Sequence, residues 1–392
     1  MTKMVSSYPH RAHIPIKATF RGVRPFYASL VVYLLLAIGS VLPTSMPVEA
    51  WLILTVLLFS TFVQFRARAV GSEFSAVIFR IWPLVLVLIP SLMRTDHLGY
   101  AVQKIDGAVF VTLLSATLAG TIIRTYGKEG FLKYFLSAIL FVLICTLIYK
   151  IMFGFWDRGV RYFINGPIVF GWMMSSGAII GLILFQQTRS KKYFILYSLF
   201  FCSALWSLSK GPLIAVFVTS LFVLLNFGRF SQKLRFVFGA IIIAFVLISF
   251  APGEQFQRIF AIARLVDGSA TSSDAGSLDI RRAMISRTLE IIGNNPLFGV
   301  GFGNWQDHAG YLGYYVYPHN IYLEIFAETG IIFGAVFVFV LIYLWIGCSI
   351  EGRAVSLVFL IGFLFSGEAP YLRLALTMLI AFRCRGANLR GC

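Results

Sequence analysis

The sequence predicts an all-α polytopic membrane protein, and two observations carry that prediction. Of its 392 residues, 59% are hydrophobic and only 12% are charged, whereas about 25% of a typical soluble protein is charged. The apolar residues also gather in runs of about 20, the length that crosses a bilayer as a helix. One water-soluble core could not bury this much apolar surface, so we expect membrane lipid to cover the excess.

Twelve apolar runs predict about twelve transmembrane helices. They lie near residues 26–42, 50–65, 74–92, 105–123, 131–153, 167–186, 193–209, 211–227, 235–251, 320–346, 353–365 and 370–382. Only the break at Lys210, Gly211 and Pro212 separates the seventh run from the eighth. Because boundaries inferred in this way shift by several residues, a count from about eleven to thirteen also fits the pattern.

Lysine and arginine gather in alternate loops, and this asymmetry sets the orientation. Most of the 33 cations lie before the first span, in every second loop, or in the tail. Short cytoplasmic loops collect such residues, so we expect both termini in the cytoplasm. The formal net charge of +17 then reflects topology, and we expect no nucleic acid partner. The polar stretch before the first span is too long for a cleavable signal peptide.

One loop on the outer side is far longer than the others and covers residues 251–318. A loop of this length is usually functional or disordered. Its middle, residues 267–277, has the composition of a flexible linker, whereas apolar residues at helical spacing predict an amphipathic helix over residues 278–293. We therefore divide the chain into nine spans (1–250), the outer loop (251–318), and three spans with a tail (319–392).

A glycine-rich stretch follows the predicted helix. Gly299, Gly301 and Gly303 are spaced like a phosphate-binding loop, but no strand precedes them and no GK[ST] follows. The more ordinary interpretation is a tight turn that folds the loop back onto the membrane. We count Gly301 as a supporting residue of the site.

His319 is the best candidate for acid–base chemistry. Pro318 ends any preceding helix, and Asn320 is a natural N-cap for the helix that enters the membrane. The positive end of that helix disfavours protonation of the imidazole and attracts phosphate. A neutral histidine in this position is able to take a proton at neutral pH. An interfacial histidine without a chemical role is the alternative.

Glu324 and Glu328 lie four residues apart, on one face of the same predicted helix. A charge within a span is costly unless it is paired or hydrated. Three interpretations stay open: the two carboxylates pair with buried cations, line a cavity, or lie in a hydrated outer turn. We count both as supporting residues.

Several cations on the outer side are not explained by the orientation of the chain. They are Lys210, Arg158, Arg161, Arg281 and Arg282. Guanidinium groups bind phosphate oxygens in pairs, and lysine acts as a point charge. Together they predict a site for an anionic ligand at the outer membrane face. Pairing with nearby aspartates or with lipid headgroups is the alternative.

No motif for a covalent nucleophile or a metal occurs in the sequence. There is no G-x-S-x-G, no HExxH and no cysteine beside a histidine. The five cysteines include no CxxC pair, so we expect neither a zinc site nor a disulfide. We expect chemistry that needs no metal and no cofactor.

Two stretches carry a resemblance to a known family. NPLFGVGFGN at residues 295–304 and PHNIYLEIFAETGIIFG at residues 318–334 follow a long outer loop in a protein of about twelve spans. In this combination the chain resembles the O-antigen ligase and polymerase superfamily, most strongly over residues 281–334. The resemblance implies a GT-C-like glycosyltransferase in the bacterial inner (plasma) membrane, with its active site on the periplasmic side. Members take a glycan from undecaprenyl pyrophosphate.

By position, the resemblance implies roles for individual residues. His319 matches the family's essential histidine and Arg281 its loop-helix arginine, while Lys210 falls where the family has an arginine in a turn between spans. Lysine keeps the charge there but loses the bidentate fork. The expected pyrophosphate-binding residues are Arg281, Lys210, Arg161, Arg158 and Arg282. His319 would take the proton of the acceptor hydroxyl as the sugar inverts.

We therefore expect an O-antigen ligase of lipopolysaccharide biosynthesis. Its partners would be an undecaprenyl-pyrophosphate-linked glycan donor, a lipid A-core acceptor and membrane lipid. A polymerase or a protein O-oligosaccharyltransferase of the same superfamily is the first alternative, because the sequence gives no signal for the acceptor. A transporter of lipid-linked substrates is the second, although the two halves show no internal repeat and the cations gather at one face.

Overall fold

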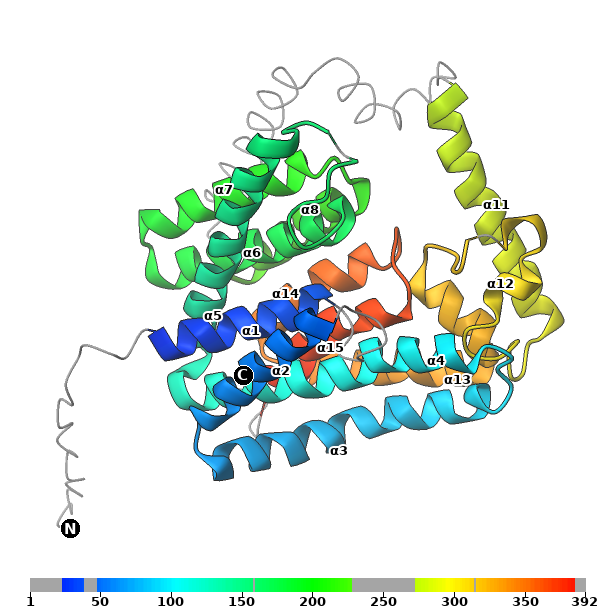
Figure 1. Ribbon diagram of the computed structural model, residues 1–392, viewed down its shortest axis with the longest axis horizontal. Coiled ribbons are helices and arrows are strands. Elements are labelled where there is room, and N and C mark those ends of the chain that lie inside the picture. The colour runs from blue at the N-terminus through cyan, green and yellow to red at the C-terminus, as the bar shows by residue number, and fades with distance from the viewer. Residues whose placement is uncertain (1–22, 39–47, 158, 228–271, 314, 385–392) are drawn as a thin grey trace, which may run out of the picture.

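The structure is a computed structural model that describes residues 23–38, 48–157, 159–227, 272–313 and 315–384. Within these ranges the chain is helical, and the only strand pairing is two isolated bridges. The α-helices are α1 (Val23–Ile38), α2 (Val48–Val63), α3 (Ala67–Leu92), α4 (Leu98–Ile105), α5 (Val111–Phe153), α6 (Pro167–Thr188), α7 (Lys191–Trp206), α8 (Lys210–Phe227), α11 (Ser272–Asn294), α12 (Trp305–His308), α13 (Ile321–Ile346), α14 (Ile350–Gly362) and α15 (Leu372–Ala381) (Figure 1). A π-helix, η2 (Asp106–Phe110), joins α4 to α5, and η3 (Gly310–Leu312) and η4 (Ala369–Tyr371) are 3-10 turns. The all-α prediction is confirmed for this part of the chain.

The predicted apolar runs coincide with helices, except for residues 235–251, which lie outside the described residues. Within the described part, 5 helical stretches are long and apolar enough to cross a membrane: Ala67–Leu92, Leu98–Phe153, Pro167–Thr188, Lys210–Phe227 and Ile321–Ile346. The count of twelve spans and the division at residues 251 and 319 stay predictions.

Helix α5 contains a break where the sequence predicts a loop between two spans. Gly127 has φ +80°, a left-handed value that glycine adopts without the steric cost of a side chain. The break falls between the predicted runs 105–123 and 131–153, so the two runs lie on opposite sides of it.

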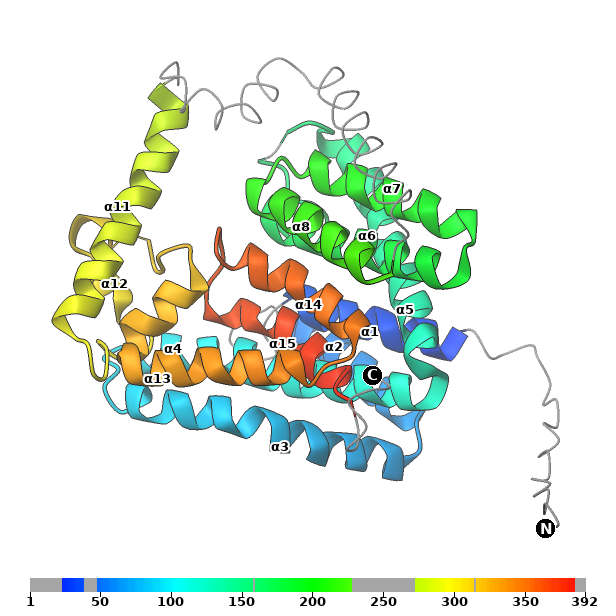
Figure 2. The same ribbon diagram turned by 180° about the vertical axis from the view of Figure 1, so that it is seen from behind.

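The helices form two groups that meet at α14 and at α5, which packs against α6 as well as α1, α3 and α15. Helices α6, α7 and α8 lie side by side in one group, while α1, α3, α13 and α15 belong to the other (Figures 1 and 2). Helix α14 packs against α6 and α8 on one side and α15 on the other. Helix α11 stands at one edge of the molecule and packs against α13.

Helix α11 is longer than the sequence predicts. It begins at Ser272, so the prediction of a flexible linker is wrong for residues 272–277, which continue the helix. Residues 267–271 of the predicted linker lie outside the described residues. Polar, alanine-containing sequence is compatible with a helix when the next turns are anchored by packing.

The buried face of α11 also differs in part from the predicted one. Met284 and Ile291 are buried in a small core with Trp305, whereas Ile285 and Leu289, two of the apolar residues of the predicted amphipathic helix, are exposed. The loop that follows the helix packs on the other side, and this tertiary contact selects the buried face.

The cysteines depart from expectation at one position. Cys145, Cys202 and Cys348 are free, but Cys384 is disulfide-bonded. The expectation of no disulfide is therefore wrong, because the absence of a CxxC motif excludes only pairs at that spacing.

Candidate functional site

His319 lies immediately before α13 and is held there by a helix cap. The side-chain oxygen of Asn320 accepts a hydrogen bond from the backbone N of Leu323 at 3.1 Å, which confirms the predicted N-cap. His319 itself has φ +56°, a left-handed conformation that is uncommon for residues with a side chain. This turn places the imidazole at the mouth of the helix.

Two aromatic rings lie against the imidazole of His319, and the charge of Arg281 acts on it. The rings of Tyr317 and Tyr315 lie 4.6 and 6.0 Å from it, both edge-on. Its Nδ1 is buried and has no hydrogen-bond partner in the part of the chain that the structure describes. Burial, followed by the positive charge of Arg281, lowers the pKa of His319 below its ordinary value of 6.5. The histidine is therefore neutral at neutral pH, the state of a proton acceptor.

Arg281 reaches this place from α11. Its Nη1 donates a hydrogen bond to the carbonyl oxygen of Phe365 at 3.1 Å, and the side chain is half-buried. Among the described residues, no carboxylate pairs with Arg281. Burial lowers the pKa of its guanidinium, but an arginine stays charged in a protein. A half-buried positive charge without an acidic partner is suited to bind an anion.

The segment that follows α14 and includes the first residue of η4, residues 363–369, ties Arg281 to the start of α13. Its Phe363 carbonyl accepts from Ile321 N at 3.2 Å, and its Leu364 carbonyl accepts from Asn320 Nδ2 at 3.1 Å. The next carbonyl in the segment is the partner of Arg281. Consecutive backbone oxygens of the 363–369 segment thus hold the predicted cap and the predicted arginine together.

Lys210 lies on another side of the same segment. It begins α8, is half-buried, and precedes Gly211, where an added Cβ would lie 3.0 Å from Cβ of Phe365. The structure therefore brings the turn of Lys210 against the segment that binds Arg281, although the three stretches are far apart in sequence.

The remaining predicted cations are not gathered in this way. Arg282 has a side chain that is 74% exposed and lies 3.8 Å from Asp279, which agrees with the alternative of pairing with an aspartate. Arg161 is exposed in a loop whose Tyr162 hydroxyl donates to the Trp206 carbonyl at the end of α7. Arg158 lies outside the described residues.

A buried ion cluster lies below His319. Lys104 of α4 places its Nζ 2.6 Å from Oε1 of Glu324 and 2.7 Å from Oε1 of Glu328, and all three side chains are 0% exposed. Of the three interpretations of the glutamates, pairing with a buried cation is the one that the structure confirms. Sequence reasoning missed Lys104, although a lone lysine at the edge of the predicted 105–123 span is itself a signal.

The ion cluster is bonded to the 363–369 segment. The second carboxylate oxygen of Glu324 accepts from the backbone N of Ala369 at 3.0 Å. The neighbouring Glu368 accepts from the Tyr100 hydroxyl at 3.0 Å, and Tyr100 lies one turn before Lys104 on α4. Helices α4 and α13 and the segment are therefore joined by buried and partly buried polar contacts.

Helix α13 breaks at Gly330, and the preceding loop satisfies the backbone groups that the break frees. Gly330 has φ +83°. Ile331 N donates to the Pro296 carbonyl at 2.7 Å, and Val300 N donates to the Ala327 carbonyl at 3.0 Å. Unpaired backbone groups are costly within a membrane protein, so these bonds stabilise the short first segment of α13.

Gly301 belongs to this backbone clamp and not to a phosphate loop. Its N donates to the Glu328 carbonyl at 3.1 Å, its φ is +104°, and a Cβ there would lie 2.5 Å from the Arg94 carbonyl oxygen. The interpretation as a tight turn is confirmed at Gly301, whose backbone binds the first segment of α13.

The amino end of α13 has few groups left for phosphate. The N–H of Ile321 donates to Phe363, and that of Leu323 donates to Asn320. The attraction of phosphate to this helix end, which we predicted from the sequence, is weakened because these donors are already used. The positive charge near this helix end therefore comes from the cationic side chains.

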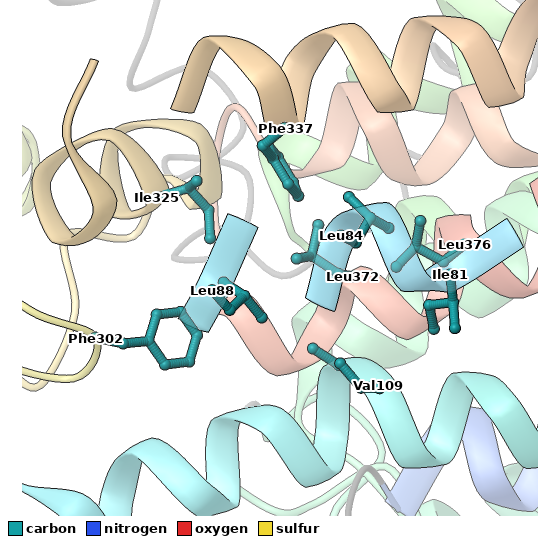
Figure 3. A pocket seen from close by; sticks show the side chains of 10 residues that line it. Ile81, Leu84, Leu88, Val109, Phe302, Ile325, Phe337, Leu372 and Leu376 are labelled. Carbon is teal, nitrogen blue, oxygen red and sulfur yellow. The ribbon is translucent and has the colours of Figure 1, made fainter. Parts of the chain in front are cut away.

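An apolar cavity lies between α3, η2, α13 and α15 (Figure 3). It is lined by Ile81, Leu84, Leu88, Ala108, Val109, Phe302, Ile325, Phe337, Leu372 and Leu376. Every one of these side chains is apolar, so the cavity offers no group for chemistry, and we do not include it in the site.

These features define a helical, multi-pass membrane protein with a neutral histidine and an arginine at the mouth of a broken membrane helix. Residues 194–339 match the family model described as O-antigen ligase. The match confirms the predicted resemblance to the O-antigen ligase and polymerase superfamily, and it supports a function of that general type. It includes Lys210, Arg281 and His319 but not Arg161. No curated protein matches the chain.

Proposed function

We propose that the protein is an O-antigen ligase, a metal-independent inverting glycosyltransferase of the bacterial inner membrane. It moves a glycan from undecaprenyl pyrophosphate to a sugar hydroxyl of lipid A-core on the periplasmic side, with both termini in the cytoplasm. The observation that carries the proposal is a neutral His319 beside an Arg281 that has no acidic partner among the described residues, within the stretch that matches the family.

The reaction is a displacement at the anomeric carbon of the donor. The acceptor hydroxyl oxygen forms the new bond to that carbon as the bond from the carbon to the pyrophosphate oxygen breaks. His319 takes the hydroxyl proton, and the electron pair of the broken bond leaves with the pyrophosphate. Because pyrophosphate is already a good leaving group, the protein needs to supply only a base and stabilisation of the developing charge.

Arg281 and Lys210 are the residues that would hold the pyrophosphate. Arg281 uses one nitrogen on the Phe365 carbonyl, so the rest of its planar fork is available for phosphate oxygens. Lys210 adds a point charge from the neighbouring turn. Arg161, and Arg158 beyond the described residues, are further candidates. Asn320, Glu324, Glu328 and Gly301 support the site by fixing the start of α13.

The test is a gel assay of purified wild type and His319→Ala, without added metal, using an undecaprenyl-pyrophosphate glycan with and without lipid A-core. We expect wild type alone to move glycan to lipid A-core, and the variant to be slower by about 100 to 10,000-fold because the general base is lost. Unchanged turnover in His319→Ala would exclude that role.

The same assay separates the alternatives. Longer donor chains without any acceptor would identify a polymerase, and glycan on an added protein acceptor would identify an O-oligosaccharyltransferase. If folded protein binds the donor and transfers nothing, the enzyme proposal fails, and flux of the donor across vesicles becomes the measurement.

A further inference from the structure

The 363–369 segment is attached to α13 at both of its ends. At one end, the Phe363 and Leu364 carbonyls accept hydrogen bonds from the start of the helix. At the other end, the Ala369 N–H donates to Glu324 at 3.0 Å. Arg281 binds the carbonyl of Phe365 between these two attachments. The position of the guanidinium therefore depends on a segment that is held from two sides.

Both carboxylate oxygens of Glu324 are engaged, one by Lys104 and the other by the backbone N–H of Ala369. Its Oε1 faces Lys104 at 2.6 Å and its Oε2 accepts from Ala369, and the side chain is 0% exposed. The ammonium group of Lys104 fixes the carboxylate in one orientation, because turning it would break a buried ion pair. The second oxygen is thereby aimed at the 363–369 segment.

We propose that Glu324 is a positioning residue: by binding Ala369 N–H it holds the 363–369 segment, and through the Phe365 carbonyl it keeps Arg281 beside His319. Lys104 acts in the same chain of contacts by orienting the carboxylate. The inference rests on the proposed function, since it gives Glu324 a role in aligning the pyrophosphate-binding arginine with the base.

Glu328 provides a matched comparison one helical turn away. It shares Lys104, at 2.7 Å, and is equally buried. Its Oε2, however, has no hydrogen-bond partner among the described residues, and no bond from its side chain to the 363–369 segment is present there. The two glutamates thus differ in the contact to the segment and are alike in residue type, burial and cation.

Glutamine substitutions separate the two contacts. In Glu324→Gln, the side-chain amide has one oxygen to accept from two donors, Lys104 and the Ala369 N–H. Its NH₂ group must therefore face one of these donors, and the hydrogen bond to that donor is lost. In Glu328→Gln, the oxygen still accepts from Lys104, and the NH₂ replaces an oxygen that has no partner. Both substitutions remove a charge that pairs with Lys104, but only the first also breaks a contact to the 363–369 segment.

The pH dependence of kcat/KM distinguishes positioning from a purely structural role. The groups around His319 are Arg281, Tyr315 and Tyr317, and the charge of Arg281 helps to keep the imidazole neutral. If Glu324→Gln releases the segment, Arg281 moves away and the acidic midpoint of kcat/KM rises toward 6.5. We expect this rise together with a loss of kcat/KM of about tenfold, the size of one lost buried hydrogen bond.

Glu328→Gln should leave the acidic midpoint in place and keep more of the transfer rate. Equal losses of kcat/KM in Glu324→Gln and Glu328→Gln, with an unchanged acidic midpoint in both, would overturn the proposal. A Glu324→Gln variant with wild-type kcat/KM and midpoint would also overturn it. In an Arg281→Ala background, the shift caused by Glu324→Gln should disappear, because the two act through one chain of contacts. A persisting shift there would also overturn it.

Two further measurements keep the proposal testable. Should Glu324→Gln not accumulate as folded protein, Asn320→Ala loosens the opposite end of the segment and should raise the same midpoint. Should wild type transfer no glycan, the proposed function fails, yet the pKa of His319 can still be followed by NMR of histidine-labelled protein. An equal His319 pKa in wild type and Glu324→Gln would then refute the positioning role separately.

Discussion

Lys104 and Arg281 are both cations beside the first turns of α13, but their surroundings differ. Lys104 is fully buried between two carboxylates at 2.6 and 2.7 Å. Arg281 is half-buried and has a single backbone carbonyl as its hydrogen-bond partner among the described residues. In the ion cluster the cation is held between carboxylates, whereas Arg281 has no acidic partner among the described residues. This difference separates the part that fixes the fold from the part proposed to act on substrate.

The largest effect is expected from Lys104→Met, which leaves two buried carboxylates without their cation. Breaking a buried pair costs about 3–5 kcal/mol of stability, so the midpoint of thermal unfolding in detergent should fall steeply. Lys133→Met is the matched control, because Lys133 pairs with Glu129 on the surface, where the side chains are 43% and 52% exposed. That loss should stay below about 1 kcal/mol. Equal losses of stability in Lys104→Met and Lys133→Met would contradict the assignment of the first ion pair as buried and the second as exposed.

Arg281→Lys should lower the rate of glycan transfer while leaving stability nearly unchanged. It keeps the charge but removes the bidentate fork, and one hydrogen bond to a charged group is worth about 1.5–3 kcal/mol, or roughly 10 to 100-fold in kcat/KM. Arg282→Lys is the control, and its rate should stay within about twofold of wild type because its side chain is 74% exposed. A similar loss of kcat/KM in Arg281→Lys and Arg282→Lys would show that the guanidinium at position 281 has no particular role in transfer.

Gly330→Ala tests the clamp between the two regions. A Cβ at this position would overlap the Leu297 carbonyl, and φ is +83°, so we expect a loss of about 1–3 kcal/mol in the free energy of unfolding. Gly293→Ala is the control, since a Cβ there meets nothing within 4 Å. Unfolding of the two variants at the same temperature would show that the clamp does not stabilise the fold.

The smallest effect is expected from pH. Because the pKa of His319 is lowered from 6.5, the neutral base persists at neutral pH and is lost only as the pH falls through the lowered value. Transfer should therefore be nearly constant from pH 8 to 7 and decline below about 6.5. A profile of kcat/KM whose acidic midpoint lies above 6.5 would contradict a neutral, buried His319.

The sequence predicts the elements better than it predicts how they meet. Apolar runs identify the helices because each run is local, and Asn320 signals its cap by residue type and position. The pair of Lys104 and Glu328 spans 224 residues, so periodicity within one helix cannot reveal it. The Phe365 carbonyl that binds Arg281 carries no signal at all, since every residue has such an oxygen. The start of α11 was missed because tertiary packing overrides composition.

The break at Gly330 also has a consequence for the order in which the protein is made. The groups freed by the break find partners in Pro296, Val300 and Gly301, which all precede α13 in the chain. A ribosome working from the amino end completes these residues first. The break at Gly330 therefore meets partners that are already made as the helix enters the bilayer, whereas the contacts of its first turn to residues 363–369 can form only after that later segment is synthesised.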